Sequence, residues 1–109
     1  MSRIAIFLLF LFVMESQTAS PKRILVIFAP SREDAAYQKQ AAELLADWAG
    51  LIERDFVVQT RFNAPAFSVV LIGKDGGEKL HQDALLTARD LFAIVDAMPM
   101  RRAEMGRGR

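Results

Sequence analysis

Hydrophobic residues along the chain form runs with two different periods. Residues 23–29 and 68–72 are apolar at almost every position, a pattern typical of strands buried on both faces. Residues 55–60 predict a third, short strand. Residues 78–81 are mostly charged or polar, which suits a strand at the edge of a sheet. We therefore expect four strands, of which the two apolar ones are central.

Two further segments have apolar residues at helical spacing. The apolar face of the first is formed by Tyr37, Ala41, Leu44, Leu45 and Trp48. Ser31 is expected to cap the start of this helix, and Gly50 suits the position just after its end. The second helix begins in a capping-box pattern at Thr87, and Pro99 is expected to end it. Trp48 is accordingly predicted to lie in the core.

The turn between the third and fourth strands helps to define the topology. It contains Lys74, Asp75, Gly76 and Gly77, and glycines permit the positive φ of a tight hairpin. The order strand-helix-strand, then strand-strand-helix, predicts a minimal α/β fold of the thioredoxin-like kind. Its mixed four-stranded sheet would have the spatial order second, first, third, fourth. The usual helix between the second and third strands is missing, and residues 61–67 are long enough to connect them as a loop.

This topology places both helices on the same face of the sheet. The central strands are nevertheless apolar on both faces, so the second face needs a cover. The candidates are residues 61–67, an N-terminal helix, a second copy of the chain, or a different protein.

The N-terminus has the pattern of an export signal. Arg3 is followed by eleven apolar residues, 4–14, and by small residues at 18–20. Eleven helical residues rise about 16 Å, against about 30 Å of membrane hydrocarbon, so no stable span is predicted. We expect a signal peptide over residues 1–20, a domain over 21–105 and a disordered basic tail over 106–109. The protein would be periplasmic or secreted, with N-terminal membrane anchoring as the alternative.

The amino-acid composition excludes several kinds of chemistry. The chain has no cysteine, which excludes thiol redox catalysis, disulfides and cysteine-ligated metals. Its 14 basic and 13 acidic residues give a net charge of +1, which predicts no nucleic-acid partner. His81 stands alone beside Asp83 and is expected to be a surface residue. No cofactor, metal site or catalytic residue is predicted.

Two segments are candidates for interaction with another molecule. The turn at residues 74–77 could form an anion-binding nest with Lys74 as counter-charge, or it could be a tight turn only. Arg101 and Arg102 follow the last predicted helix, where cations complement the helix dipole or contact a partner. Met100 belongs to a group of methionines around Pro99 that could be a soft binding patch or could pack in the core.

Four segments of the chain resemble a known family. They are residues 23–31, 53–55, 71–77 (LIGKDGG) and 96–105 (DAMPMRRAEM). The family is a domain of unknown function of the P-DUDES type. It includes small secreted bacterial proteins and is similar to modules of sushi-repeat and equarin-like extracellular matrix proteins. The resemblance implies a thioredoxin-like fold and supplies no catalytic residues. The chain departs from the family pattern by being short between Thr60 and Phe67.

Together these observations predict an exported, cysteine-free thioredoxin-like domain that works by binding and not by catalysis. The alternative is a divergent enzyme of the thioredoxin-like group that uses no thiol. The expected partner is a second copy in weak self-association, or an extracytoplasmic protein.

Overall fold

A computed structural model describes residues 21–107 of the chain. Four strands form one mixed sheet in the order β2-β1-β3-β4, with β1 parallel to β2 and antiparallel to β3. The strands are β1 (Arg23–Phe28), β2 (Phe56–Arg61), β3 (Ser68–Ile72) and β4 (Glu78–Gln82). The helices are α2 (Ala35–Ala46), α3 (Trp48–Glu53), α4 (Ala88–Asp96) and α5 (Pro99–Arg107). This confirms the predicted mixed α/β fold and its sheet order, which are consistent with a small thioredoxin-like fold.

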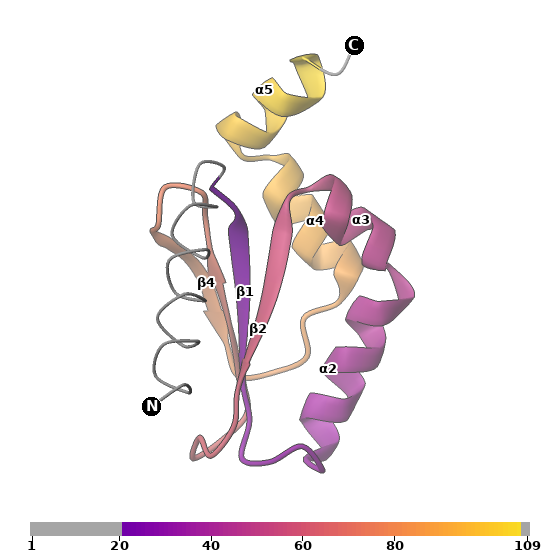
Figure 1. Ribbon diagram of the computed structural model, residues 1–109, viewed down its shortest axis with the longest axis vertical. Coiled ribbons are helices and arrows are strands. Elements are labelled where there is room, and N and C mark those ends of the chain that lie inside the picture. Colours follow the sequence, from indigo (N-terminus) through magenta and orange to yellow (C-terminus); the bar gives the residue numbers. More distant parts are fainter. Residues whose placement is uncertain (1–20, 108–109) are drawn as a thin grey trace, which may run out of the picture.

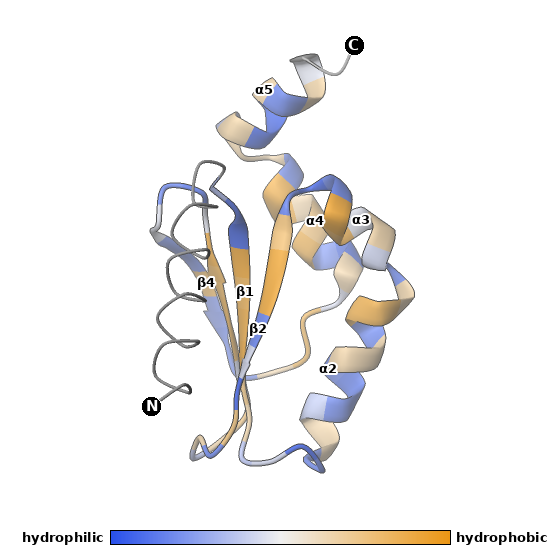
Figure 2. Ribbon diagram, in the orientation of Figure 1, coloured by the Kyte–Doolittle hydropathy of each residue, from blue (hydrophilic) through white to orange (hydrophobic). Residues whose placement is uncertain are grey.

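The hydrophobic core lies between one face of the sheet and the helices (Figures 1 and 2). Its fully buried side chains include Leu25, Val69 and Leu71 from the strands and Leu51, Leu91 and Val95 from the helices. Since successive strand residues point to opposite faces, the other face carries Ile24, Phe28, Val70 and Ile72. None of the described helices covers that second face (Figure 1).

The segment between β2 and β3 contains no helix, as predicted. It is held against the start of the β1–α2 connection by two backbone hydrogen bonds, from Asn63 N–H to Pro30 O and from Ala64 N–H to Ala29 O, both 3.1 Å. Asn63 has a φ of 67°, a left-handed conformation that asparagine tolerates better than most residues. Phe67 then enters the core, so the loop is anchored at both ends.

The first helix differs from its prediction at its start. Asp34, not Ser31, caps α2, because its carboxylate accepts a hydrogen bond from Tyr37 N–H at 3.0 Å. Ser31 lies one turn earlier and uses its backbone carbonyl to accept from Asp34 N–H. The chain makes a turn before the helix begins, which moves the cap three residues along.

The prediction of one continuous helix as far as Gly50 was also wrong. The helix breaks at Asp47 and restarts as α3, which changes the direction of its apolar face. Leu51 is therefore buried, whereas Trp48 is 45% exposed and does not lie in the core. Gly50 is inside α3 and not beyond the end of a helix. A Cβ atom there would lie 2.6 Å from the ring of Phe92, so glycine permits the close approach of α4.

A buried polar side chain links α2 to the β4–α4 connection. Gln40 is fully buried, and its amide both donates to Leu86 O and accepts from Leu86 N–H, each at 2.9 Å. These two hydrogen bonds satisfy a stretch of backbone that has no strand or helix partner. Gln40 lies on the buried face of α2, although it was not among the apolar residues from which that face was predicted.

Pro99 does not end the helical structure. Helix α4, capped by the hydroxyl of Thr87 as predicted, stops at Asp96, and Pro99 is the first residue of α5. Proline is well suited to a first helical position because its missing N–H would have no helical partner there. The segment expected to follow the last helix is thus a helix itself, and it extends beyond the end of the sheet (Figure 1).

The predicted signal segment, residues 1–20, lies outside the described residues, as do residues 108 and 109 of the predicted tail. Within residues 21–107, no helix has both the length and the apolar character needed to cross a membrane.

Candidate functional site

The hairpin between β3 and β4 is a tight, hydrogen-bonded turn. Gly73 N–H donates to Gly77 O at 2.9 Å, and Gly76 N–H donates to Gly73 O at 3.0 Å. Gly76 has a φ of 85°, which favours glycine. Asp75 accepts from Gly77 N–H at 2.9 Å and from Lys79 Nζ at 2.8 Å. The hydrogen bond from Lys79, and then that from Gly77, hold the pKa of Asp75 below its ordinary value.

Lys74 points away from its own turn. Its ammonium lies 2.8 Å from a carboxylate oxygen of Asp55 and 2.6 Å from one of Glu104, and its side chain is only 10% exposed. Burial by itself would lower the pKa of Lys74, but the hydrogen bonds to these two carboxylates outweigh it and the pKa is raised. The charge of Lys74 is therefore satisfied inside the protein, and it does not serve an anion on the turn.

Glu104 joins α5 to the first strand as well as to the turn. Both of its oxygens lie 3.3 Å from the guanidinium of Arg23, which is almost completely buried. Arg23 also donates to the backbone oxygen of Arg54 at 2.8 Å. Burial opposes ionisation of Glu104, but the hydrogen bonds from Lys74 and Arg23 lower its pKa on balance. A single carboxylate thus fixes α5 against two other elements.

A second group of ion pairs holds the other side of α5. Arg101 is buried and contacts carboxylate oxygens of Asp96 at 3.1 Å and Glu53 at 2.6 Å. Arg54 binds the other oxygen of Asp96 at 2.9 Å and stacks over the ring of Phe92 at 4.0 Å. The hydrogen bond from Arg54 lowers the pKa of Asp96, burial opposes this, and Arg101 adds to the lowering. Helices α3, α4 and α5 are joined at this point.

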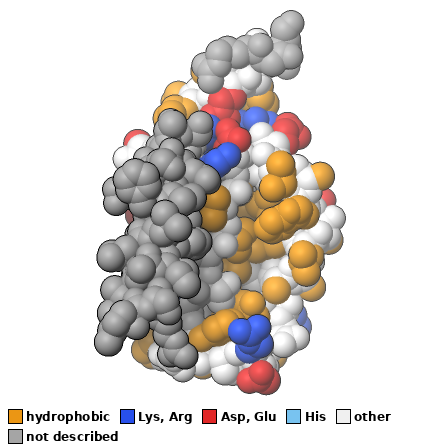
Figure 3. Space-filling model, in the orientation of Figure 1, with side chains coloured by type: hydrophobic (Ala, Val, Ile, Leu, Met, Phe, Trp, Pro, Cys, Tyr) orange, Lys and Arg blue, Asp and Glu red, His pale blue; other side chains and the backbone are white. Residues whose placement is uncertain are grey.

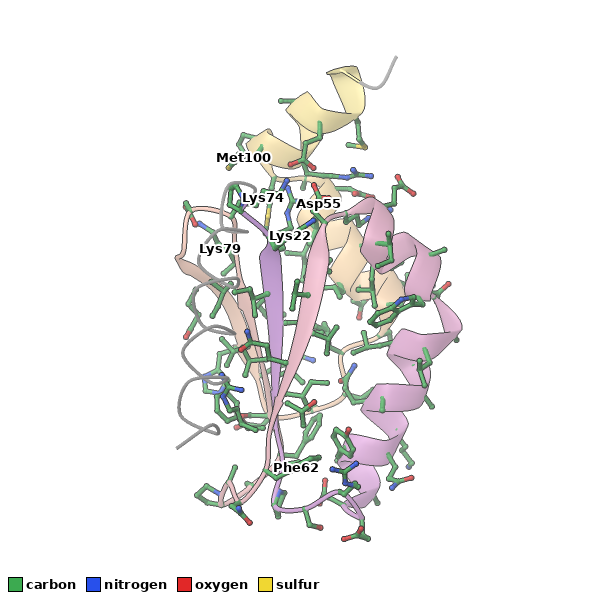
Figure 4. The ribbon with its side chains drawn as sticks, in the orientation of Figure 1. Lys22, Asp55, Phe62, Lys74, Lys79 and Met100 are labelled. Atoms are coloured by element: carbon green, nitrogen blue, oxygen red, sulfur yellow. The ribbon has the colours of Figure 1, made fainter. Side chains whose placement is uncertain are left out.

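The two candidate segments meet at one cavity. A cleft of about 340 Å³ separates the hairpin from the start of α5, and it is lined by Asp75, Lys79, Met98, Pro99 and Met100. Lys74, Lys79 and Met100 gather at this end of the molecule, together with Lys22 and Asp55 (Figure 4). We call this cavity the turn–α5 cleft. Its walls come from segments about twenty residues apart along the chain.

The predicted candidates have different positions around the turn–α5 cleft. Asp75 and Met100 line it, and Met100 is 49% exposed. Lys74 and Arg101 lie in the ion pairs that hold its walls, and Arg102 is exposed on α5. Gly76 and Gly77 shape the hairpin.

Other residues of this region were not selected from the sequence. They are Arg23, Asp55, Lys79, Asp96 and Glu104. Four of them lie in the segments that carry the family resemblance. Membership of those segments was the one sequence signal that could have selected them as site residues, since isolated charges form no recognisable pattern. Lys79 belonged only to a charged edge strand.

His81 is a surface residue, as predicted. Its side chain is 53% exposed, and its Nε2 lies 3.6 Å from a carboxylate oxygen of Asp83. Among residues 21–107, no group of three or more histidine, cysteine or acidic side chains is arranged to hold a metal ion.

The chain matches the model of one protein family, the domain of unknown function DUF4174, over residues 16–66 and 59–104. These segments span most of the chain, so the protein belongs to this family. The two matches overlap at residues 59–66, which include most of the loop between β2 and β3. Searches among curated proteins and among solved structures gave no match.

Proposed function

We propose that this protein is an exported, non-catalytic binding module of the thioredoxin-like kind, and that it holds an apolar group of a partner protein in the turn–α5 cleft. The observation that carries this proposal is the meeting of the hairpin and the Met98–Met100 segment around one cavity. Its volume of about 340 Å³ falls at the lower end of the range for small binding sites.

The lining of the cleft supports an apolar ligand with a polar rim. Thioether side chains are flexible and polarisable, so Met98 and Met100 can adapt to differently shaped apolar groups. Asp75 and Lys79 form an ion pair at the edge of the cleft, where a partner's backbone or polar groups would be hydrogen-bonded. This is the usual arrangement of a small protein interface, with an apolar centre and a polar margin.

The ion pairs behind the cleft favour binding over proton transfer. Arg101 is buried, and Lys74 and Glu104 are largely buried. Lys74 pairs with Glu104 and Asp55, Arg101 pairs with Asp96, and none of these side chains lines the cleft. Charged groups arranged in this way fix the separation of the two walls before a ligand arrives. A preformed site loses less conformational entropy on binding than a flexible one.

A photo-crosslinking experiment tests the proposed binding site. A benzophenone amino acid replaces Met100 in the full chain, which is produced in the cells that normally make it. We expect a discrete crosslinked product of higher mass. The matched control carries the same group at Arg89, an exposed residue of α4 away from the cleft. No product at position 100, or the same products at both positions, would contradict the proposal.

Export is tested separately by mass spectrometry of the protein recovered outside the cytoplasm. We expect an N-terminus between Thr18 and Lys22, because the apolar segment 4–14 ends shortly before. Recovery of a chain that still begins at Met1, in the membrane fraction, would favour the anchored form instead.

A further inference from the structure

Strand β2 has a free edge. Within residues 21–107 it pairs with β1 on one side and with no strand on the other. The backbone oxygen of Asp55 accepts from Arg23 N–H at the start of β1, and that of Arg61 accepts from Ala29 N–H just after its end. Alternate residues from 55 onward therefore face β1. Because backbone groups alternate in direction along a strand, the N–H and C=O groups of Phe56, Val58 and Thr60 face outward.

The opposite edge of the sheet is protected in a way that β2 is not. Strand β4 carries Glu78 and Lys79, and its pairing with β3 is interrupted by a register shift. Charges and irregular pairing are devices that discourage an edge strand from joining another chain. The first five residues of β2, FVVQT, contain no charge and no proline, and its pairing with β1 is regular.

An apolar surface accompanies this free edge. Six large hydrophobic side chains are exposed in the described part of the chain, and four of them surround β2: Leu45 (69%), Trp48 (45%), Ile52 (56%) and Val57 (40%). A groove of about 150 Å³ runs between α2 and β2. Its lining includes Leu45, Trp48, Val58 and Thr60. Hydrophobic side chains gather over this side of the molecule (Figure 3).

We propose that this surface joins two copies of the protein. The β2 strands pair antiparallel about a two-fold axis at Val58, which extends the two sheets into one. In this register Phe56 lies opposite Thr60 of the second copy, so every outward-facing backbone group of β2 finds a partner. This inference is independent of the turn–α5 cleft, which lies at the end of the sheet and stays open in the dimer.

Charge selects the antiparallel arrangement. Strand β2 begins after Asp55 and ends at Arg61, so its two ends have opposite signs. Pairing about Val58 places Asp55 of each copy opposite Arg61 of the other, whereas parallel pairing would align like charges. The Asp55 side chain contacts Lys74 and, at 3.7 Å, Lys22 of its own chain, but it is still 41% exposed and can face Arg61 of the second copy.

The helical side of the interface is self-complementary. A two-fold axis perpendicular to the sheet keeps the helices of both copies on one face, so the Leu45, Trp48 and Ile52 stripe of one copy meets the same stripe of the other. Trp48 and Val58 line the same groove, which places Trp48 close to the axis. An unrelated extended peptide would satisfy the edge of β2 but would leave these exposed side chains uncovered.

Sedimentation velocity over a hundredfold concentration range tests the dimer. The sample is protein purified from the cells that make it. We expect a reversible monomer–dimer equilibrium and, because Trp48 is the single tryptophan, a blue shift of its fluorescence as the dimer forms. Val57→Lys should raise the dissociation constant at least tenfold, since an edge lysine opposes strand pairing. Leu85→Lys is the matched control, because Leu85 is 41% exposed, and it should leave the constant unchanged.

Disulfide capture tests the register. The chain has no cysteine of its own, so Val57→Cys and Gln59→Cys are single-thiol variants. Residues 57 and 59 of opposite copies form a non-hydrogen-bonded pair with Cα atoms about 4.5 Å apart, within disulfide range. Mixed and oxidised, the two variants should crosslink faster than either alone. A protein that stays monomeric over the whole range, equal effects of Val57→Lys and Leu85→Lys, or no preference for the mixed crosslink would overturn the proposal.

Discussion

The turn–α5 cleft and the β2 edge depend on different kinds of interaction. The cleft is held by buried ion pairs between segments far apart in the sequence, such as Arg23 and Glu104. The β2 edge is made of backbone groups and apolar side chains from one short stretch. The first therefore depends on several carboxylates that join distant segments, whereas the second depends on a carboxylate only through the proposed pairs between Asp55 and Arg61 of opposite copies. Changes in one region should leave the other nearly intact.

Glu104→Gln should have the largest effect. It leaves the buried Arg23 without a carboxylate and Lys74 with Asp55 alone, and breaking a buried pair on one side costs about 3 kcal/mol. Urea unfolding should show this loss, while β2 dimerisation of the folded protein remains. Asp83→Asn is the control, because that side chain is 86% exposed, and it should change the unfolding midpoint far less. Equal midpoints for the two variants would contradict a structural role for the ion pairs.

Gln40→Leu should reduce stability without affecting either surface selectively. The change leaves Leu86 N–H and C=O buried and unbonded, which costs about 2 kcal/mol. Below its unfolding transition the variant should still give the Met100 crosslink and the same dimer constant. Loss of only one of these properties would mean that Gln40 serves that surface in particular.

Acid should destabilise the folded protein through the ion pairs at its cleft end. The pKa values of Asp55, Asp96 and Glu104 are lowered in the folded protein, so their stabilisation is complete above the ordinary values of 3.8 and 4.5. It is lost as the pH falls below these values toward the lowered pKa. The raised pKa of Lys74 has the opposite sign, and its contribution is lost only as the pH rises above 10.5. Thermal unfolding between pH 3 and pH 7 measures the loss of stability as these carboxylates are protonated. An unfolding temperature that does not change over this range would contradict the prediction.

Gly76→Ala should have the smallest effect. Space is open around Gly76, so the cost comes only from its φ of 85° and amounts to about 1 kcal/mol. Gly106→Ala is the counterpart, because that glycine also has open space but lies in a helix, where alanine is favoured. Unfolding midpoints should move in opposite directions. If both variants were destabilised, backbone conformation would not explain the role of Gly76.

The sequence predicted the strands because the two central ones are continuous apolar runs, and the edge strand β4 is a short polar segment directly after a hairpin turn. It also predicted the hairpin at residues 74–77, since the turn chemistry is contained in those residues. It did not predict that the first helix breaks at Asp47 or that Pro99 begins a further helix, because a helix boundary depends on which partner each apolar face meets. Gly50 is an example: a glycine is needed there because the ring of Phe92 packs against it, and not because a helix ends there.

The ion pairs around the cleft were beyond sequence reasoning for a different reason. Arg23 and Glu104 are 81 residues apart, and nothing near either residue indicates its partner. The sequence left open whether residues 74–77 form an anion-binding nest with Lys74 as counter-charge or a tight turn only, and the long side chain of Lys74 in fact reaches Asp55 and Glu104. Which charges meet is decided by the folded topology. The resemblance motifs located most of these residues without showing that they lie together.

Amide hydrogen exchange of α5 is the most direct test of the claim that ion pairs hold this helix and thereby form the turn–α5 cleft. In the unaltered protein we predict that the amides of α5 near Arg101 and Glu104 are protected, although the helix extends beyond the sheet. In Glu104→Gln this protection should fall sharply while β1 and β3 stay protected. Equal protection of α5 in the two proteins would contradict the account.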